Sequence, residues 1–230
     1  MFTSVKIAPS ILSADFMNFG RDIAELEQGG ADWLHVDVMD GHFVPNLTFG
    51  VPFVAQAKRA TSLPLDVHLM ISNPLIQVPW YIEAGADSIT VHIEAFDTPE
   101  EVGQVLQMIR DAGVSVALAL KPDCPIERLR PFIAELDMVL VMSVFPGFSG
   151  QAYIEGSEHR VAEVAAMAQQ YNPHVLIQVD GGISASRTAG LVAQYGADVL
   201  VAGSGVFKAS DRAQAIQDIR IAATKAQTIL

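Results

Sequence analysis

The chain has one cysteine, few aromatic residues and no long apolar run. Cys124 is the single cysteine among 230 residues, so an internal disulfide is excluded and we expect a reducing compartment. Apolar runs such as 138–145 last about eight residues, far short of the ~20 that a membrane-spanning helix needs. The first residues carry no apolar stretch long enough for a signal peptide. These absences predict a cytoplasmic protein without a membrane partner.

Positive charge is also scarce. The sequence has 14 Lys and Arg against 26 Asp and Glu, which gives a formal net charge of −12. This field repels nucleic acids and anionic membranes, and no basic cluster offsets it, so we expect neither as a partner. A phosphorylated ligand would have to be held by local geometry. Half of the residues are apolar and no stretch looks like a linker, which predicts one globular domain over residues 1–230.

A fourfold repeat organises the chain. Gly-Ala-Asp precedes an apolar, β-rich run at 30–32, 85–87 and 196–198, and Leu136-Asp137 precedes a similar run. The aspartates of successive copies lie 55, 50 and 61 residues apart, which suits a unit of two strands and two helices. The eight β-rich runs are 5–12, 33–38, 65–70, 88–93, 114–120, 138–144, 175–180 and 199–204.

Amphipathic stretches alternate with these runs. They cover 15–29, 51–60, 73–84, 98–112, 125–135, 154–170, 184–195 and 210–228. Eight β-rich runs, each followed by a helix, predict an all-parallel sheet that is buried on both faces. A closed barrel and an open doubly wound sheet both fit, but the fourfold repeat favours closure at eight strands. No Gly-x-Gly-x-x-Gly motif follows the first run to indicate a dinucleotide site. We therefore predict an α/β protein with a (β/α)8 TIM-barrel fold.

Polar side chains interrupt the apolar strands near the ends where a barrel carries its chemistry. His35 and Asp37 alternate with valines in the second strand, His68 lies in the third, and Asp180 ends the seventh. Such groups are costly to bury unless they are paired or bind a metal. Two imidazoles and two carboxylates suit a divalent ion, with zinc as first choice and manganese, cobalt or iron(II) as alternatives. The other interpretation is a set of core histidines bonded to nearby carboxylates.

Other residues near the strand ends have simpler interpretations. Asp66 shares a face with His68 and either orients that imidazole or forms an ordinary polar pair in the core. His92 is assigned to a loop or to the core. Cys124 has no neighbouring histidine, so we do not expect a nucleophile there. Three methionines at strand ends are expected to fill space and to give the site an apolar surface: Met39, Met70 and Met142.

Glycine-containing loops follow the last three strands, at 145–151, 180–184 and 203–205. On one side of a barrel mouth they would present a set of backbone N–H groups, where this fold usually binds phosphate. The loops contain no Lys or Arg, so main-chain donors would bind the anion. They predict a phosphorylated small molecule as substrate.

The motifs together resemble ribulose-phosphate 3-epimerases, in order and over nearly the whole chain. The resemblance is carried by APSILSAD at 8–15, HVDVMDGHFVPN at 35–46, DVHLM at 66–70, MSVFPGFSGQ at 142–151, VDGG at 179–182 and VAGSGVF at 201–207. It implies a barrel that interconverts ribulose 5-phosphate and xylulose 5-phosphate in the pentose phosphate pathway, with one divalent ion. It also implies a homo-oligomer, either a dimer or a hexamer.

The resemblance assigns roles to residues. The ion would be bound by His35, Asp37, His68 and Asp180, and the acid/base pair would be Asp37 and Asp180. Substrate contacts would come from Ser10, His68, Gly147, Phe148, Ser149, Gly150, Gly181, Gly182, Gly203 and Ser204.

The sequence departs from the family pattern at a few positions. Phe145 and Ser149 replace residues of the usual NPGFGGQ run, Gly205 stands for alanine, and Lys121 for asparagine. These departures leave a six-carbon ketose phosphate such as allulose 6-phosphate open as the substrate. A non-catalytic homologue that binds sugar phosphates is a further alternative. A metal-free lyase or decarboxylase is disfavoured, because 66–68 reads Asp-Val-His without the lysine of an Asp-x-Lys-x-x-Asp run.

Overall fold

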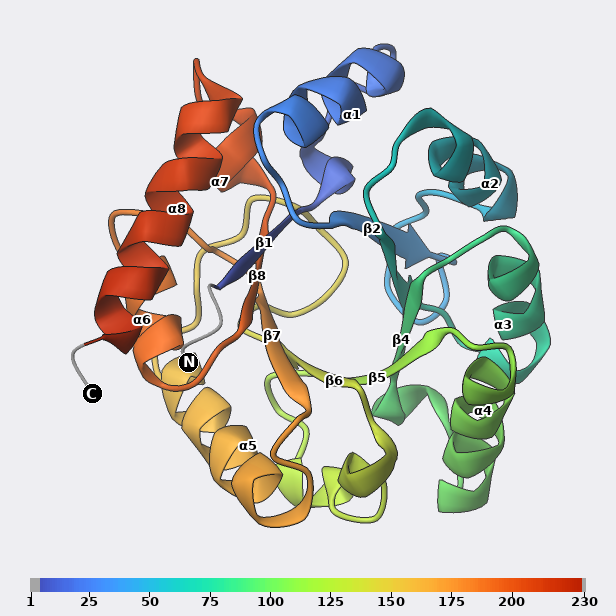
Figure 1. Ribbon diagram of the computed structural model, residues 1–230. Coiled ribbons are helices and arrows are strands. Elements are labelled where there is room, and N and C mark those ends of the chain that lie inside the picture. The colour runs from blue at the N-terminus through green and yellow to red at the C-terminus, as the bar shows by residue number, and fades with distance from the viewer. Residues whose placement is uncertain (1–4, 229–230) are drawn as a thin grey trace.

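Eight parallel strands form a barrel in the computed structural model, which describes residues 5–228 (Figure 1). The strands are β1 (Lys6–Pro9), β2 (Leu34–Met39), β3 (Leu65–Met70), β4 (Ser88–His92), β5 (Ser115–Leu120), β6 (Met138–Met142), β7 (Leu176–Asp180) and β8 (Val199–Ala202). Their order is β1-β8-β7-β6-β5-β4-β3-β2. A parallel bridge between Ser10 and His35 joins β1 to β2. The predicted (β/α)8 barrel is confirmed.

Helices ring the barrel on its outside (Figure 1). They are α1 (Phe19–Gln28), α2 (Val51–Ala60), α3 (Pro74–Glu83), α4 (Pro99–Asp111), α5 (Ser157–Tyr171), α6 (Ala189–Gln194), α7 (Ser204–Phe207) and α8 (Arg212–Gln227). The helix predicted over 125–135 is wrong. Two 3-10 turns, Ile126–Leu129 and Ile133–Glu135, take its place. Pro131 lies between them, and because it has no N–H it interrupts a helical hydrogen-bond ladder. Within residues 5–228, no helix combines the length and the apolar character that crossing a membrane demands.

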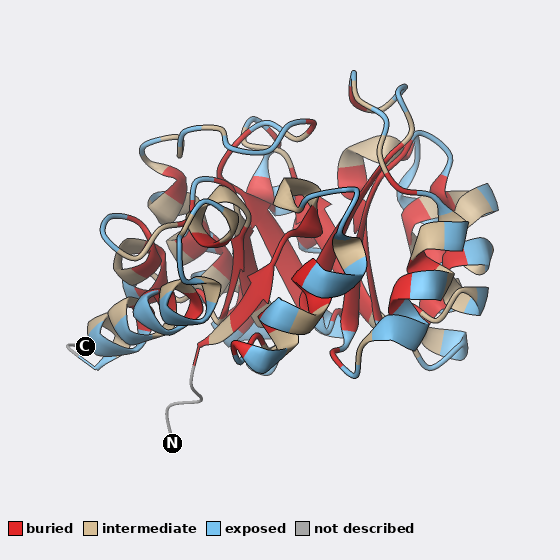
Figure 2. Cartoon of the chain, turned by 90° about the horizontal axis from the view of Figure 1, so that it is seen from above, coloured by how far each residue is buried: buried red, intermediate tan, exposed pale blue. Residues whose placement is uncertain are grey.

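Alternation along the strands divides the core into two parts. In β2, Val36 and Val38 pack with the apolar cluster between barrel and helices, whereas His35 and Asp37 point the other way, into the barrel. Figure 2 shows buried strands at the centre and helices whose outer faces are exposed. Because every second strand residue faces the barrel interior, a polar residue at such a position is held in a fixed, largely dehydrated place.

The repeated aspartates lie where the even-numbered strands begin. The carboxylate of each one accepts a hydrogen bond from a backbone N–H of the preceding odd-numbered strand: Asp32 from Ile7 at 2.8 Å, Asp87 from Leu65 at 2.8 Å, Asp137 from Val116 at 2.8 Å and Asp198 from Ile177 at 2.9 Å. The backbone N–H of each aspartate donates back to the carbonyl of that same partner, at 2.8 to 3.0 Å. The repeat seen in the sequence therefore clamps strands in pairs, at the end of the barrel away from the predicted site.

The clamp at β7 and β8 gives a stability prediction. Asp198→Ala removes the acceptor of the buried Ile177 N–H, which should cost about 1–3 kcal/mol of unfolding free energy. Burial raises the pKa of Asp198, so Asp198→Asn, which keeps an oxygen acceptor without a charge, should stay close to wild type. Urea unfolding of the three proteins measures both effects. An asparagine variant as unstable as the alanine variant would contradict the clamp.

Candidate active site

The four predicted metal-binding residues meet at the carboxyl ends of their strands. His35 and Asp37 come from β2, His68 from β3, and Asp180 from the end of β7. One ligand atom from each lies within 4.8 Å of the other three. Among residues 5–228, this is the one group of three or more His, Cys, Asp and Glu side chains arranged to hold a metal ion. Parallel strands far apart in sequence thus deliver a compact N/O donor set.

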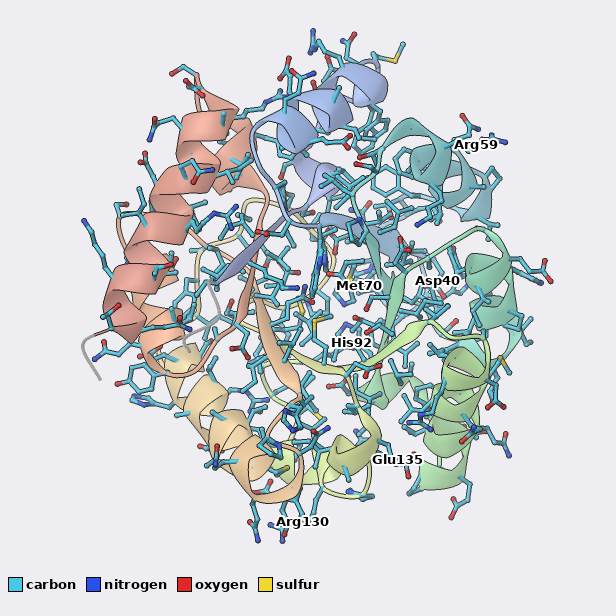
Figure 3. All side chains as sticks on the ribbon, viewed as in Figure 1. Asp40, Arg59, Met70, His92, Arg130 and Glu135 are labelled. Carbon is cyan, nitrogen blue, oxygen red and sulfur yellow. The ribbon has the colours of Figure 1, made fainter. Side chains whose placement is uncertain are left out.

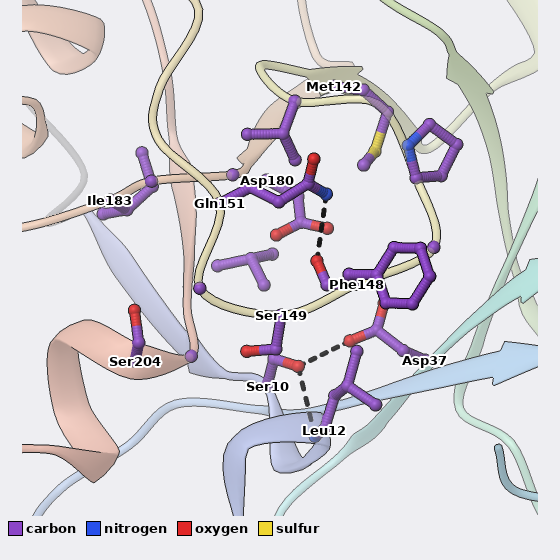
Figure 4. A pocket seen from close by; sticks show the side chains of 18 of the residues that line it. Ser10, Leu12, Asp37, Met142, Phe148, Ser149, Gln151, Asp180, Ile183 and Ser204 are labelled. Atoms are coloured by element: carbon purple, nitrogen blue, oxygen red, sulfur yellow. Dashed lines mark hydrogen bonds between the residues drawn. The ribbon is translucent and has the colours of Figure 1, made fainter. Parts of the chain in front are cut away.

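The carboxylate of Asp37 lies at the centre of this group. Its Oδ1 is 3.1 Å from Nδ1 of His68 and 3.3 Å from Nε2 of His35. Its Oδ2 accepts a hydrogen bond from the Ser10 hydroxyl at 2.5 Å, drawn as a dashed line in Figure 4. Burial alone would raise the pKa of Asp37, but the two imidazoles outweigh it and hold this pKa well below its usual range. Asp37 is therefore ionised at neutral pH.

Each imidazole uses its other nitrogen to contact a further residue. Nδ1 of His35 lies 2.7 Å from Oδ2 of Asp66, and Nε2 of His68 lies 2.8 Å from Nε2 of His92. Nε2 of His35 is buried and makes no hydrogen bond within the described chain. The nitrogens that remain are the two that face Asp37, so the surrounding contacts leave both rings in an orientation that a metal ion could use.

For two neighbouring residues the structure selects one of the predicted alternatives: Asp66 forms a polar pair in the core, and His92 belongs to the core. Asp66 contacts His35 rather than His68, because the parallel register pairs Asp66 with His35 and pairs His68 with Asp37. The sequence of a single strand does not specify how that strand aligns with its neighbour, so the alignment of β2 with β3 could not be predicted. His92, assigned to a loop or to the core, is a buried residue of β4 that touches His68. In Figure 3, His92 and Met70 lie toward the centre of the barrel.

The second carboxylate of the predicted acid/base pair also lines the pocket (Figure 4). Asp180 comes from β7, which β8 and β1 separate from the β2 strand of Asp37. Burial, followed by the negative charge of Asp37, raises the pKa of Asp180 to about 6. A carboxyl group with a pKa near neutral suits both the removal and the return of a proton. The two aspartates therefore approach one pocket from different strands.

A pocket at the carboxyl ends of the strands is bordered by both carboxylates. It is lined by the predicted substrate-contact residues except His68, which is fully buried and contacts Asp37. The three strand-end methionines also line it. Phe145, a departure from the family pattern, is half exposed and is absent from the pocket wall, whereas Ser149 belongs to it.

Backbone groups form one side of the pocket. Gly181 has a φ of 123°, and an added Cβ would come within 2.6 Å of a Val144 methyl group. A Cβ on Gly182, with φ 61°, would come within 2.5 Å of the Tyr153 nitrogen. Only glycine fits at either position. The N–H groups of Gly182, Gly203 and Ser204 make no hydrogen bond within the described chain. Clustered free N–H groups are suited to an anion.

The 145–151 loop over the pocket is anchored by side chains that the sequence interpretation did not single out. Asn46 donates to the Gly147 carbonyl at 2.8 Å. The hydroxyls of Ser13 and Ser149 lie 2.5 Å apart and connect this loop to the segment after β1. Asn46 ends the HVDVMDGHFVPN motif, which was the one signal in the sequence that could have indicated it. These contacts hold the loop across the pocket mouth.

Cys124 gives a test of the predicted lack of a nucleophile. Burial, followed by the nearby Glu94 carboxylate, raises the pKa of this thiol to about 11 from a usual value of 9.0. Two pKa units leave about 100-fold less thiolate near pH 8, and the side chain is only 4% exposed. A disulfide reagent should therefore modify the folded protein at least ~100-fold more slowly than the unfolded chain. Equal rates would contradict the burial of this thiol.

The chain is similar to known proteins over nearly its whole length. The sequence model of the ribulose-phosphate 3-epimerase family matches residues 6–207. The ribulose-phosphate 3-epimerase of Bacillus subtilis (strain 168) is 46% identical over 217 residues, which covers 94% of this chain and 98% of that protein. The ribulose-phosphate 3-epimerase of Rhodobacter capsulatus is 50% identical over 205 residues, covering 89% and 87%. A solved structure of 3-hexulose-6-phosphate synthase from Salmonella typhimurium shares the fold, with a TM-score of 0.69 at 18% identity over 96% of this chain and 99% of that one.

Proposed function

The chain belongs to the ribulose-phosphate 3-epimerase family, and we propose that it interconverts D-ribulose 5-phosphate and D-xylulose 5-phosphate by inverting C3. The observation that carries this proposal is the meeting of Asp37 and Asp180, from separate strands, at one pocket with a mixed histidine and carboxylate donor set. Family membership makes the enzyme an isomerase. The choice of substrate and the mechanism are the parts that need testing.

Inversion beside a carbonyl requires two proton-transfer groups. The hydrogen on C3 is acidified by the adjacent carbonyl, and it must leave from one face while another proton arrives at the opposite face. A single base returns the proton to its own side and leaves the configuration unchanged. Asp37 and Asp180 lie on strands that β8 and β1 separate, so they supply two groups that approach the pocket from different directions. We propose that one aspartate removes the C3 hydrogen of one epimer and that the other aspartate removes the C3 hydrogen of the other epimer.

The residues also fit a resident divalent ion, with zinc as first choice. His35, Asp37, His68 and Asp180 would hold it, and the buried Nε2 of His35, which makes no hydrogen bond within the described chain, is the observation that favours a ligand there. When bound, the ion supplies positive charge that stabilises negative charge developing on the oxygens next to C3. Asp37 and His68 place their donor atoms through the hydrogen bonds already described.

The glycine-containing loops would hold the phosphate end of the substrate. The unpaired N–H groups of Gly182, Gly203 and Ser204 would bind the phosphate through backbone dipoles rather than through charged side chains. No Lys or Arg of the described chain lines this pocket. A phosphate fixed at this end places the carbon chain toward Asp37 and Asp180, so the distance along the sugar selects which carbon is inverted. Ser10 holds Asp37 in place and borders the same space.

Turnover of two substrates tests the assignment. We expect kcat/KM for ribulose 5-phosphate to exceed that for allulose 6-phosphate by at least ~10-fold, because a further carbon between C3 and the phosphate would shift C3 away from the two aspartates when the phosphate is held by the loops. A large preference for the hexulose phosphate would move the proposal to that substrate. Binding of the pentulose phosphate without any C3 exchange in heavy water would instead indicate a sugar-phosphate sensor.

We further propose that the enzyme is a cytoplasmic homo-oligomer, from its single cysteine and its family resemblance. Light scattering after size-exclusion chromatography distinguishes a dimer from a hexamer. A monomeric mass at micromolar concentration would contradict the oligomer.

A further inference from the structure

A chain of hydrogen-bonding groups leads away from His68 to a carboxylate outside the predicted metal-ligand set. Nε2 of His68 lies 2.8 Å from Nε2 of His92, and Nδ1 of His92 lies 3.2 Å from Oε2 of Glu94. The other oxygen of Glu94, Oε1, accepts from the backbone N–H of Lys121 at 2.7 Å. Both imidazoles are fully buried, and the Glu94 side chain is 16% exposed. This chain is called the Glu94 relay below.

The relay has one consistent proton arrangement once His68 binds a metal. The nitrogen that faces Asp37 is Nδ1, so a neutral His68 that ligates through Nδ1 carries its proton on Nε2. That proton is donated to Nε2 of His92, which must then be without a proton. A neutral imidazole has a single N–H, so the proton of His92 lies on Nδ1 and is donated to Glu94. Each link fixes the next one.

A carboxylate is the one side chain of this shape that completes the relay. Glu94 accepts two hydrogen bonds, one from the His92 ring and one from the backbone of Lys121. A glutamine in its place offers one oxygen and one NH₂ group. With its oxygen toward Lys121, the NH₂ group would face Nδ1 of His92 and favour the opposite tautomer. With its oxygen toward His92, two N–H donors would meet at Lys121.

The surroundings hold the relay in place. Glu94 lies in the 3-10 turn Ile93–Ala95 directly after β4, so the strand that carries His92 also carries its partner. The His92 ring packs against the Phe43 ring at a centroid distance of 4.9 Å. The ammonium group of Lys121 lies over the Phe43 ring, 3.7 Å from its centroid. Packing on this side leaves the His92 ring little freedom to turn or to pair with water.

We propose that Glu94 is a positioning residue, which acts through His92 to fix the proton of His68 on Nε2 and to leave Nδ1 free for a divalent ion. This inference rests on the proposed metal site. Groups that fix the orientation and tautomer of a ligating histidine are typically worth 10- to 100-fold in metal affinity. Glu94→Gln, which keeps the size of the side chain, should weaken zinc binding by about that factor.

Two measurements test the relay, on wild type, Glu94→Gln and a matched control. Zinc affinity is measured by competition with a chelator. In the zinc-loaded proteins labelled with ¹⁵N-histidine, NMR reports which ring nitrogens carry protons, a readout independent of activity. The control is Glu27→Gln, because Glu27 also accepts from a backbone N–H, that of Ser62, and from the Thr61 hydroxyl, at the opposite end of the barrel.

The expected result is a wild type with protons on Nε2 of His68 and Nδ1 of His92. Glu94→Gln loses this pattern and binds zinc 10- to 100-fold more weakly, while Glu27→Gln matches wild type in both measurements. A wild-type His92 with its proton on Nε2 would overturn the relay even if Glu94→Gln failed to fold. Equal zinc affinity in wild type and Glu94→Gln would overturn it as well. A wild type that binds no divalent ion would defeat the metal site itself, and this inference with it.

Discussion

Asp180→Asn is expected to lower kcat for epimerisation by at least ~10²-fold, the scale for loss of a group that transfers a proton in the transition state. Asp37→Asn should do the same. An amide cannot take a proton from C3, and it has no acidic proton to return. Steady-state turnover in both directions measures the loss. The matched control is Asp198→Asn, which makes the same chemical change at the far end of the barrel and should keep full activity.

The two variants should also differ from each other. With one aspartate left, the epimer whose C3 hydrogen faces that group can still lose the hydrogen and regain one from solvent on the same side. In heavy water each variant should therefore exchange C3 hydrogen in one epimer without inverting it, and the exchanging epimer should differ between Asp37→Asn and Asp180→Asn. NMR of the recovered sugar phosphates reports this. Exchange of both epimers by either variant would refute the two-aspartate mechanism.

Removal of the divalent ion should lower activity and stability together. A chelator should reduce kcat/KM by at least ~10²-fold, because several kcal/mol of charge stabilisation is lost. A ligand at 100 times its Kd stabilises a folded protein by about 2.7 kcal/mol. For a chain of this size that corresponds to about 5 to 11 °C in Tm. Thermal unfolding with excess zinc and with chelator measures the difference.

A variant of His68 also tests the binding of the divalent ion. His68→Ala should bind less than one equivalent of metal and should show little response of its Tm to zinc. His174→Ala, which changes an exposed histidine, is the control and should behave as wild type. Full metal content in His68→Ala would remove this residue from the ligand set.

The fold was predictable because its signals are local and repeated. The strand runs are largely apolar, as expected for strands buried on both faces, and the aspartate repeat marks the start of every even-numbered strand. The error at 125–135 has a local cause as well. Amphipathic spacing extends across Pro131, but the missing N–H of that proline breaks the helix into two short turns.

The four residues of the candidate metal site were predictable, whereas the contacts that support them were not. Four residues stand out because burying polar groups inside apolar strands costs free energy unless these groups are paired or bind a metal. They are His35, Asp37, His68 and Asp180. The partners of these residues depend on the register between strands, which pairs Asp66 with His35 and places His92 beside His68. Nothing in a single strand encodes that alignment, so the relay that ends at Glu94 became visible only in three dimensions.

The origin of the C3 hydrogen in the product distinguishes one proton-transfer group from two. Wild-type enzyme converts ribulose 5-phosphate in heavy water, and the reaction is stopped at low conversion. If separate aspartates act on opposite faces of C3, the xylulose 5-phosphate formed carries solvent deuterium at C3, while the recovered substrate keeps most of its hydrogen. Xylulose 5-phosphate that retains the original C3 hydrogen of the substrate would mean that one hydrogen moved from one face of C3 to the other, which separate aspartates open to solvent exchange do not allow.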